Sequence, residues 1–422
     1  MRSFILKGTI CYSTSPTELA VFENSYAICV DGVSKGVFEE IPVEYAALPV
    51  LDYGDRLIVP GMVDLHIHAP QYTFRGTGMD LELMDWLQQQ AFPEEARFES
   101  RAYAEKAYEI FAQQMKNSAT TRAVVFGTRH GDSTEILMEK LEKTGLVTFV
   151  GKVNMDQNAP EPLVEESADA SEADTLGWLR HTIDRFERTK PILTPRFIPS
   201  CSRRLLEKLG KIREEYGLPV QSHLSENPGE IAFVRQLFPE EPSYGHCYER
   251  FGLLGEDTIM AHCVYSSPEE VRLLREKGTF IAHCPASNTN LASGIAPVRA
   301  YLDGGLRVGL GSDVAGGHTE SMFRAITDAV QMSKLYWRLV DNSCKPLCFA
   351  EGFYLATLGG GRFFGQVGSF APGYEFDALV LDERAMPGWG DMTPRQRLEQ
   401  YAYLEKGGSS LQAKFVRGRQ IL

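Results

Sequence analysis

Long apolar runs are missing from this sequence of 422 residues. No stretch reaches the roughly 18 uninterrupted apolar residues of a transmembrane helix, so no membrane-spanning segment is expected. A charged residue, Arg2, precedes the first apolar segment, and the N-terminus does not resemble a signal peptide. We therefore expect a cytoplasmic protein without a membrane partner.

Positive charge is also in short supply. The chain has 43 Lys and Arg against 56 Asp and Glu, which gives a formal net charge of −13. A groove for DNA or RNA needs clustered Lys and Arg, and no such cluster occurs. The acidity mainly favours solubility, and we expect a small uncharged or cationic substrate rather than a nucleic acid.

Close cysteine pairs are nearly absent. The eight cysteines are scattered and lie mostly in apolar runs, which suits reduced thiols in a cytosolic enzyme better than a disulfide framework. Cys344 and Cys348 are close in sequence, but no second pair exists to complete a zinc ribbon. The Pro-Cys-x-x-Cys pair of the zinc deaminases that act on flipped bases is also missing, which argues against nucleic-acid editing.

Histidine, in contrast, is placed in a pattern. His66 and His68 end an apolar run at residues 58–68, and side chains at i and i+2 of a strand point to the same face. Such a pair alone is more often incidental than a ligand set. Three further runs, at 218–223, 258–262 and 279–283, also end in His, and the run at 306–313 ends in Asp313. The recurrence predicts a metal site, which no single pair would.

The predicted metal ligands are His66, His68, His223 and Asp313. Each of them alone could instead be a buried, hydrogen-bonded side chain. Together, imidazole and carboxylate suit one Zn²⁺ ion with room for a water molecule, whose pKa the metal lowers to about 7.

Two further residues are predicted to act beside the metal. Glu226 follows His223 by three residues and is the candidate for proton transfer; its alternative is a surface loop acid. His262 is the candidate for hydrogen bonding to the attacking oxygen or the intermediate. For His283, a structural role and a site role remain equal alternatives.

The pattern of runs also predicts the fold. Residues 60–369 alternate apolar runs with amphipathic helices, and eight runs end near residues 68, 126, 153, 197, 223, 262, 283 and 313. This predicts an α/β fold of the (β/α)8 TIM barrel type. A doubly wound open sheet is the alternative, but its ligands converge on one switch point. Residues from strands one, five, six and eight must meet here, which favours a closed ring.

Short strands flank the predicted barrel at both ends. Residues 1–59 and 370–422 are therefore predicted to form one small β-sandwich domain. The local signals predict a hairpin near residues 31–32, helices at 101–117, 205–212 (ending near Gly217) and 267–278, and a last strand over 413–422. Residues 154–180 are expected to be a loop and the start of a helix.

The ordered set His-x-His, His-x-x-Glu, His and Asp resembles the amidohydrolase superfamily. More narrowly, the chain resembles the guanine deaminases, through His-Ala-Pro-Gln-Tyr at 68–72 and Thr-Pro-Arg-Phe at 194–197. The other segments that carry the resemblance are 60–67, 151–156, 222–227, 260–262, 282–285 and 309–317.

The resemblance implies a zinc-dependent conversion of guanine and water to xanthine and ammonia, in purine catabolism or salvage. It also implies substrate contacts from Gln71, Arg196 and Phe197, with His262 beside them, and a homodimer. Arg196 would donate to the purine carbonyl oxygen, Gln71 would bind ring atoms, and Phe197 would pack on the purine face. Without the resemblance, Arg196 would be interpreted as a salt-bridge residue and Phe197 as core.

Dinuclear members of the superfamily carry a carbamylated Lys at the end of strand four, where this chain has Arg196 and Phe197. One metal ion is therefore expected, since Lys152 lies on strand three. The alternatives are a sister amidohydrolase acting on an adenosine derivative or an aminotriazine, and a catalytically dead scaffold, as some dihydropyrimidinase-like proteins are. Dead scaffolds lose metal ligands, and this chain keeps them.

Overall fold

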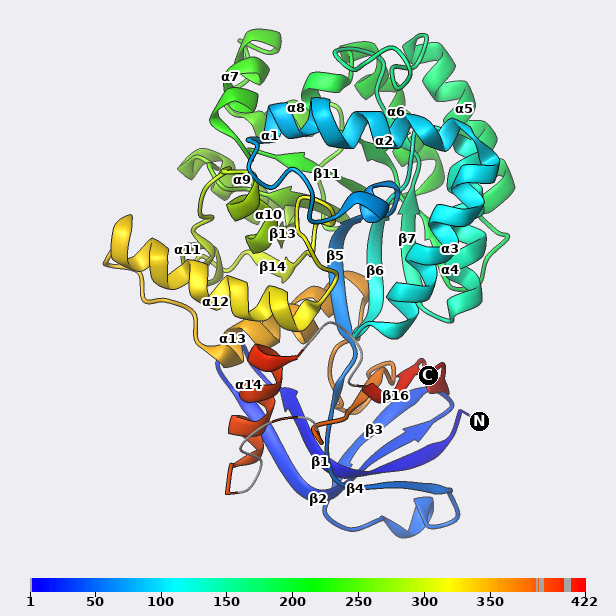
Figure 1. Ribbon diagram of the computed structural model, residues 1–422, viewed down its shortest axis with the longest axis vertical. Helices are drawn as coiled ribbons and strands as arrows, with labels where there is room; N and C mark the ends of the chain where they lie inside the picture. Colours follow the sequence, from blue (N-terminus) through cyan, green and yellow to red (C-terminus); the bar gives the residue numbers. More distant parts are fainter. Residues whose placement is uncertain (1, 385, 387–390, 406–410) are drawn as a thin grey trace.

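The computed structural model describes residues 2–384, 386, 391–405 and 411–422, so Met1 and, in the predicted C-terminal β-part, residues 385, 387–390 and 406–410 lie outside it. A ring of strands surrounded by helices lies above a β-sheet, and both chain ends lie at that sheet (Figure 1). Among the described residues, no helix is long and apolar enough to cross a membrane.

Eight parallel strand positions form the ring. One set of paired strands is β5 (Met62–His68), β6 (Thr120–Phe126), β7 (Val147–Gly151) and β9 (Thr189–Pro191), and the other is β11 (Val220–Leu224), β12 (Thr258–His262), β13 (Phe280–His283) and β14 (Arg307–Leu310). The short pair β8 (Val153–Asn154) and β10 (Thr194–Pro195) extends strand positions three and four.

Backbone hydrogen bonds close both seams between these sets. At one seam, Leu193 donates to Pro219 at 2.9 Å and accepts from Gln221 at 2.9 Å. At the other, Asp313 donates to His66 at 2.8 Å and His68 donates to Val314 at 2.9 Å. The ring is therefore closed, as the predicted TIM barrel requires, and the open-sheet alternative is wrong.

Helices cover the outside of the ring. They are α3 (Arg101–Asn117), α4 (Gly131–Thr144), α5 (Ala168–Thr182), α6 (Arg203–Tyr216), α7 (Pro228–Leu237), α8 (Tyr244–Arg250), α9 (Pro268–Lys277), α10 (Pro285–Asn290), α11 (Val298–Asp303), α12 (Met322–Leu339) and α13 (Phe349–Tyr354). The three predicted helices are α3, α6 and α9, and the helix expected within 154–180 is α5. Gly217 ends α6 in the left-handed conformation at φ 62°, which costs glycine little.

A bulge in β5 aims the two histidines into the ring. Val63 and Leu65 belong to the apolar cluster inside the barrel, whereas Ile67 belongs to the layer between strands and helices. The pairing of β5 with β6 is irregular between Asp64 and Ile67, and such an irregularity changes which side chains face inward. His66 and His68 thereby share one face, as predicted, at the end of the strand.

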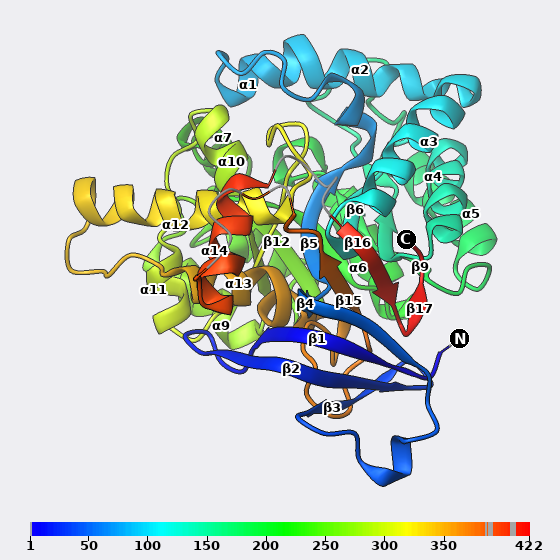
Figure 2. The same cartoon turned by 60° about the horizontal axis from the view of Figure 1, so that its bottom comes forward.

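Both chain ends contribute to one seven-stranded sheet in the order β17-β16-β15-β4-β1-β2-β3. Its strands are β1 (Phe4–Ser13), β2 (Leu19–Val30), β3 (Val33–Phe38), β4 (Val50–Pro60), β15 (Ala378–Leu381), β16 (Leu411–Val416) and β17 (Arg419–Gln420). Figure 2 shows the strands of the two ends beneath the barrel, with α14 (Pro394–Leu404) beside them. The β-domain from both ends is thus present, while the exact boundaries at 59/60 and 369/370 stay a prediction.

One local prediction about this sheet is wrong. Residues 413–422 do not form a single strand, because Arg417 at φ 49° and Gly418 at φ 69° turn the chain between β16 and β17. The predicted hairpin near residues 31–32 is present between β2 and β3, where Val30 pairs with Val33.

Candidate metal centre and active site

A cavity of about 460 Å³, measured with its open mouth, lies at the carboxyl ends of the barrel strands. Active sites of TIM barrels lie at this end, since the loops after the strands meet there. The segment with α1 (Leu83–Trp86), a π-helical turn (Leu87–Ala91) and α2 (Phe92–Ala96) runs across this end (Figure 1). Leu83, Trp86 and Leu87 from this segment line the cavity.

Four donor atoms from three strands converge beside the cavity. The Nε2 atoms of His66 and His68 are 3.2 Å apart, and those of His68 and His223 are 3.3 Å apart. Asp313 Oδ1 is 3.2 Å from His66 Nε2 and 3.3 Å from His68 Nε2. A tetrahedral ion with bonds of about 2.0–2.1 Å places its ligands roughly 3.3–3.4 Å apart. The predicted ligand set therefore has the spacing of a metal site.

Burial keeps these imidazoles neutral, as metal ligands must be. It lowers the pKa values of His66 and His223, and lowers that of His68 to about 4. His223 Nδ1 donates to the carbonyl oxygen of Arg196 at 2.6 Å, which leaves the lone pair on the Nε2 that faces the other donors.

Cys284 lies close to His66 and Asp313 and offers an alternative third donor. Burial raises the pKa of its thiol well above the usual range, and the sulfur lies 3.4 Å from the carbonyl oxygen of Ala282, to which it donates. Its S–H group is thereby engaged by the backbone rather than directed at the other donors. The nitrogen-and-oxygen set therefore fits a divalent ion better, and His66, His68 and Asp313 form a buried metal-binding group.

Lys152 is engaged elsewhere. Its ammonium is fully buried, 2.5 Å from Glu165 Oε1 and 3.3 Å from Asp174 Oδ2. It therefore has its own counter-ions outside the cluster of donors.

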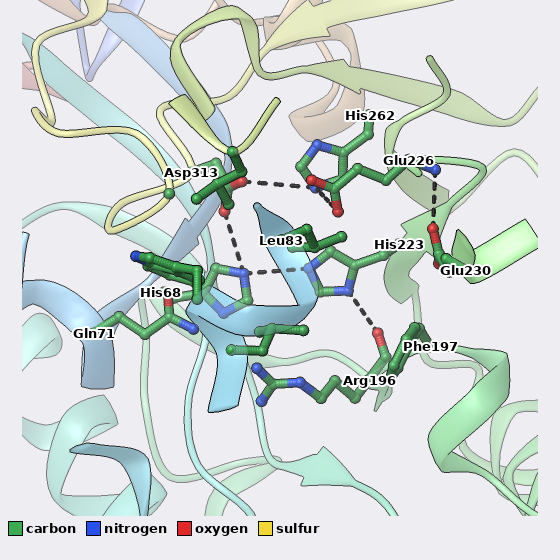
Figure 3. A pocket seen from close by; sticks show the side chains of 14 residues that line it. His68, Gln71, Leu83, Arg196, Phe197, His223, Glu226, Glu230, His262 and Asp313 are labelled. Atoms are coloured by element: carbon green, nitrogen blue, oxygen red, sulfur yellow. Dashed lines mark hydrogen bonds and ion pairs between the residues drawn. The ribbon is translucent and has the colours of Figure 1, made fainter. Parts of the chain in front are cut away.

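Glu226 lies beside these donors and is buried, so it is not a surface loop acid. Ser293 Oγ donates to Glu226 Oε1 at 2.9 Å, which leaves Oε2 facing His262 Nε2 at 3.4 Å (Figure 3). Burial, together with the charge of Asp313, raises the pKa of Glu226 to about 8. A carboxyl group that holds a proton near neutral pH can act as a general acid.

His262 is held in place by Asn288. Its Nδ1 is 2.9 Å from Asn288 Oδ1, and because an amide oxygen only accepts, Nδ1 carries the proton. Nε2 thus faces Glu226, and it lies 3.6 Å from Asp313 Oδ2. His262 at φ 74° and Asp313 at φ 46° have left-handed backbones, a strain often found at functional sites.

The predicted substrate residues form another wall of the cavity. Gln71, Arg196 and Phe197 all line it, and Arg196 and Gln71 lie near each other below the histidines (Figure 3). Gln71 lies in a short 3-10 helix (Ala69–Phe74) that follows β5, and Arg196 follows β10. The strand ends thus bring metal donors and substrate residues together.

His283 is buried at the end of β13. Among the described residues, its Nδ1 has no hydrogen-bond partner, and burial lowers its pKa to about 3. It is not among the residues that line the cavity. The choice between a structural role and a site role stays open.

Sequence reasoning missed several residues of the site, among them Asp64, Glu95, Asn288 and Ser293. Asp64 accepts from the backbone of His66 and Ser312, Glu95 binds Arg196 and Gln71, and the last two hold His262 and Glu226. Asp64 lies within a segment that carries the resemblance, and membership of that segment was the only sequence feature that pointed to a role for it in the site. The others lie on helices or loops, where no periodic pattern points to the site.

The comparisons with known proteins agree with this geometry. The model of the Amidohydrolase family matches residues 57–419. A guanine deaminase of Mus musculus is 37% identical over 443 residues, covering 100% of this chain and 97% of that protein. The chain belongs to the guanine deaminases of the amidohydrolase family.

A solved guanine deaminase has the same architecture. The crystal structure of the guanine deaminase from C. acetobutylicum, with guanine bound in its active site, is 43% identical, with a TM-score of 0.96 and 100% of both chains covered. A zinc-containing adenosine deaminase from Xanthomonas campestris matches with a TM-score of 0.84, but at 22% identity over 99% of this chain and 92% of that one. That second likeness shows the fold alone. The fold is therefore shared with the sister enzymes, while the sequence groups this chain with the guanine deaminases.

Proposed function

We propose that this chain hydrolyses guanine to xanthine and ammonia. The observation that carries the proposal is the match, over the full length at 43% identity, to a guanine deaminase with guanine in its active site. The cavity beside the four donors, lined by Gln71, Arg196 and Phe197, supports it. Such an activity would belong to purine degradation or salvage.

The substrate is held by its carbonyl edge and by its ring face. Arg196 donates N–H groups to the carbonyl oxygen, because a guanidinium has donors only. Gln71 binds ring atoms with its amide, and the half-buried Phe197 packs on the ring face. This orientation turns the amino-bearing carbon towards Glu226 and the donor cluster.

Glu226 moves the protons. It gives its proton to the ring nitrogen beside the amino-bearing carbon, which makes that carbon electrophilic, and it then takes a proton from the attacking water. The new C–O bond forms there; Glu226 then gives the proton it took from the water to the amine, the C–N bond breaks with release of ammonia, and the remaining O–H proton returns to Glu226 as the new ring carbonyl forms. His262 and Asp313 Oδ2, which face the same space, hydrogen-bond the added oxygen.

One Zn²⁺ ion is the proposed cofactor, held by His66, His68, His223 and Asp313. When bound, zinc supplies a water molecule whose pKa is lowered to about 7. The nitrogen-rich donor set and its spacing support zinc, and Lys152, which is paired with Glu165, supports a single ion. Elemental analysis should find about one zinc per chain; the absence of bound metal would contradict an active enzyme.

A cytoplasmic homodimer is the proposed form of the protein. Free thiols support a reducing compartment, since all eight cysteines are unpaired. Closed two-fold dimers are the commonest assemblies of soluble proteins. Sedimentation or light scattering of the purified chain tests the oligomeric state directly.

One assay tests the reaction. The purified, zinc-loaded chain is incubated separately with guanine, adenine, cytosine and pterins, and ammonia is measured. Guanine should give ammonia and an equal amount of xanthine, at a rate well above the other substrates. Arg196→Ala should then lower guanine turnover strongly, because the purine carbonyl loses its donor; unchanged turnover would make the substrate assignment wrong.

A further inference from the structure

Glu95 connects the two polar residues of the substrate wall. It lies on α2, and its side chain is 3% exposed. Its Oε2 accepts from Arg196 Nη1 at 2.5 Å, and its Oε1 accepts from Arg196 Nη2 at 3.1 Å and from Gln71 Nε2 at 2.7 Å. One carboxylate thus binds both residues that are proposed to recognise the purine.

The carboxylate fixes which way the amide of Gln71 points. An ionised carboxylate only accepts hydrogen bonds, so it faces the NH₂ group and repels the amide oxygen. At the other end, Gln71 Oε1 accepts from the backbone N–H of Ala315 at 3.2 Å. If the amide of Gln71 were flipped, its oxygen would face the carboxylate of Glu95 and its NH₂ group would face the backbone N–H of Ala315, and both contacts would be repulsive. Gln71 therefore keeps one orientation, with one remaining N–H available to a ligand.

The same carboxylate is the counter-ion of Arg196 and fixes its direction. It occupies two of the five N–H donors of the guanidinium in a two-point pairing, which restricts rotation of the planar group. The guanidinium carbon also lies 5.1 Å from the ring centre of Phe92, which belongs to α2 as well. The buried positive charge is thereby balanced, and the unused N–H groups keep a fixed direction.

We propose that Glu95 is a positioning residue that determines the specificity of the purine site for a ring carbonyl. It acts by holding Arg196 and Gln71 as a fixed set of donors. This inference rests on the proposed function, since it concerns the same cavity. A purine with a 6-carbonyl satisfies these donors, whereas a purine without it leaves them unpaired, which costs binding free energy.

The proposal predicts a selective loss, which a general disturbance of α2 would not produce. Two substrate analogues separate the effects: hypoxanthine, which has the 6-carbonyl, and purine, which lacks it. In the full-length, zinc-loaded Glu95→Gln variant, the Kd for hypoxanthine should rise about tenfold or more, because a bond to a charged group is lost. The Kd for purine should change less than about threefold. Calorimetry measures both without turnover.

Glu94→Gln is the matched control. Glu94 is the neighbour of Glu95 on α2, and it binds Thr73, Arg97 and Tyr103 rather than the substrate wall. This variant should keep the ratio of the two affinities. Glu95→Asp, which keeps the charge on a shorter side chain, should restore part of the preference for hypoxanthine.

Three results would overturn the proposal: an unchanged hypoxanthine affinity in Glu95→Gln, an equal loss for both analogues, or the same selective loss in Glu94→Gln. If Glu95→Gln does not fold, Glu95→Asp decides the question. A purely structural role predicts that Glu95→Asp binds both compounds more weakly but keeps the ratio of their affinities, and this result would contradict the proposal. The proposed function fails separately, if the wild-type chain releases no ammonia from guanine.

Discussion

Glu226 shows how position at the residue scale changes the chemistry of a side chain. On an exposed loop it would be an ordinary carboxylate. Here burial and the nearby Asp313 raise its pKa to about 8, and Ser293 holds one of its oxygens. Its second oxygen is left facing the cluster, where a proton has to be moved.

Glu226→Gln should reduce guanine turnover by about 10²–10⁴, because an amide of the same shape cannot transfer the proton. Steady-state kinetics measure this, with zinc content checked in parallel. Glu166→Gln, the same change at an exposed position, should leave turnover unchanged. Retained turnover in Glu226→Gln would move the proton-transfer role to another group, with His262 as the next candidate.

The residue scale also shows where sequence reasoning ends. His66, His68, His223, His262 and Asp313 were predicted because each ends an apolar run, and strand ends of a barrel meet at one mouth. Glu95 and Asn288 lie on helices, and Ser293 lies in a loop. Their partners are 24 to 101 residues away in the chain, so only the folded structure brings them to the site.

At the scale of elements, Asp64 joins the first and the last strand positions of the ring beside the metal donors. Its Oδ1 accepts from the backbone N–H of Ser312 at 3.0 Å and of His66 at 3.2 Å, and its Oδ2 accepts from Ser312 Oγ at 2.6 Å. Gly311 lets the strands approach, since a Cβ there would lie 2.8 Å from His66 Cβ. The seam therefore sets the position of His66 and Asp313 together.

Asp64→Ala should lower the free energy of unfolding by about 2–4 kcal/mol, because it leaves three buried donors without their acceptor. It should also weaken zinc retention, since both neighbouring ligands lose their support. Urea unfolding and zinc release to a chelator measure the two effects. Asp64→Asn keeps an oxygen acceptor in the same place and should lose much less stability and zinc retention. Equal losses of both in the two variants would contradict the role of these hydrogen bonds.

Elements themselves were largely predictable. The eight strand positions and helices α3, α6 and α9 follow from periodicity and from serine and glycine at the helix ends. The bulge in β5 and the turn at Arg417 were not predictable. A bulge depends on the partner strand, and an arginine, here at φ 49°, is not a residue type that signals a turn.

At the scale of the whole molecule, a buried ion pair joins the barrel to the β-domain. Arg122 on β6 donates from Nε to Asp377 at 2.6 Å and from Nη2 at 3.0 Å, and it also contacts Glu375 at 2.7 Å. The side chains of Arg122 and Asp377 are 3% and 0% exposed. Lys414 on β16 adds bonds to the carbonyl oxygens at the end of α3.

Arg122→Met should destabilise the chain by about 3–5 kcal/mol, because Asp377 would keep a buried charge without its partner. Urea unfolding measures the change. Arg101→Met removes the arginine of an ion pair whose side chains are 63% and 75% exposed, and it should cost less than about 1 kcal/mol. Similar effects in the two variants would mean that the buried pair does not hold the two parts together.

The zinc dependence of guanine hydrolysis tests the account most directly. The chain is freed of metal, zinc is added back in fractions of an equivalent, and bound zinc and xanthine formation are followed together. Activity should rise in proportion to bound zinc and level off at one ion per chain, and His223→Ala should bind zinc weakly and stay inactive. Full xanthine formation by the metal-free chain, or a plateau at two ions per chain, would contradict the single metal site of His66, His68, His223 and Asp313.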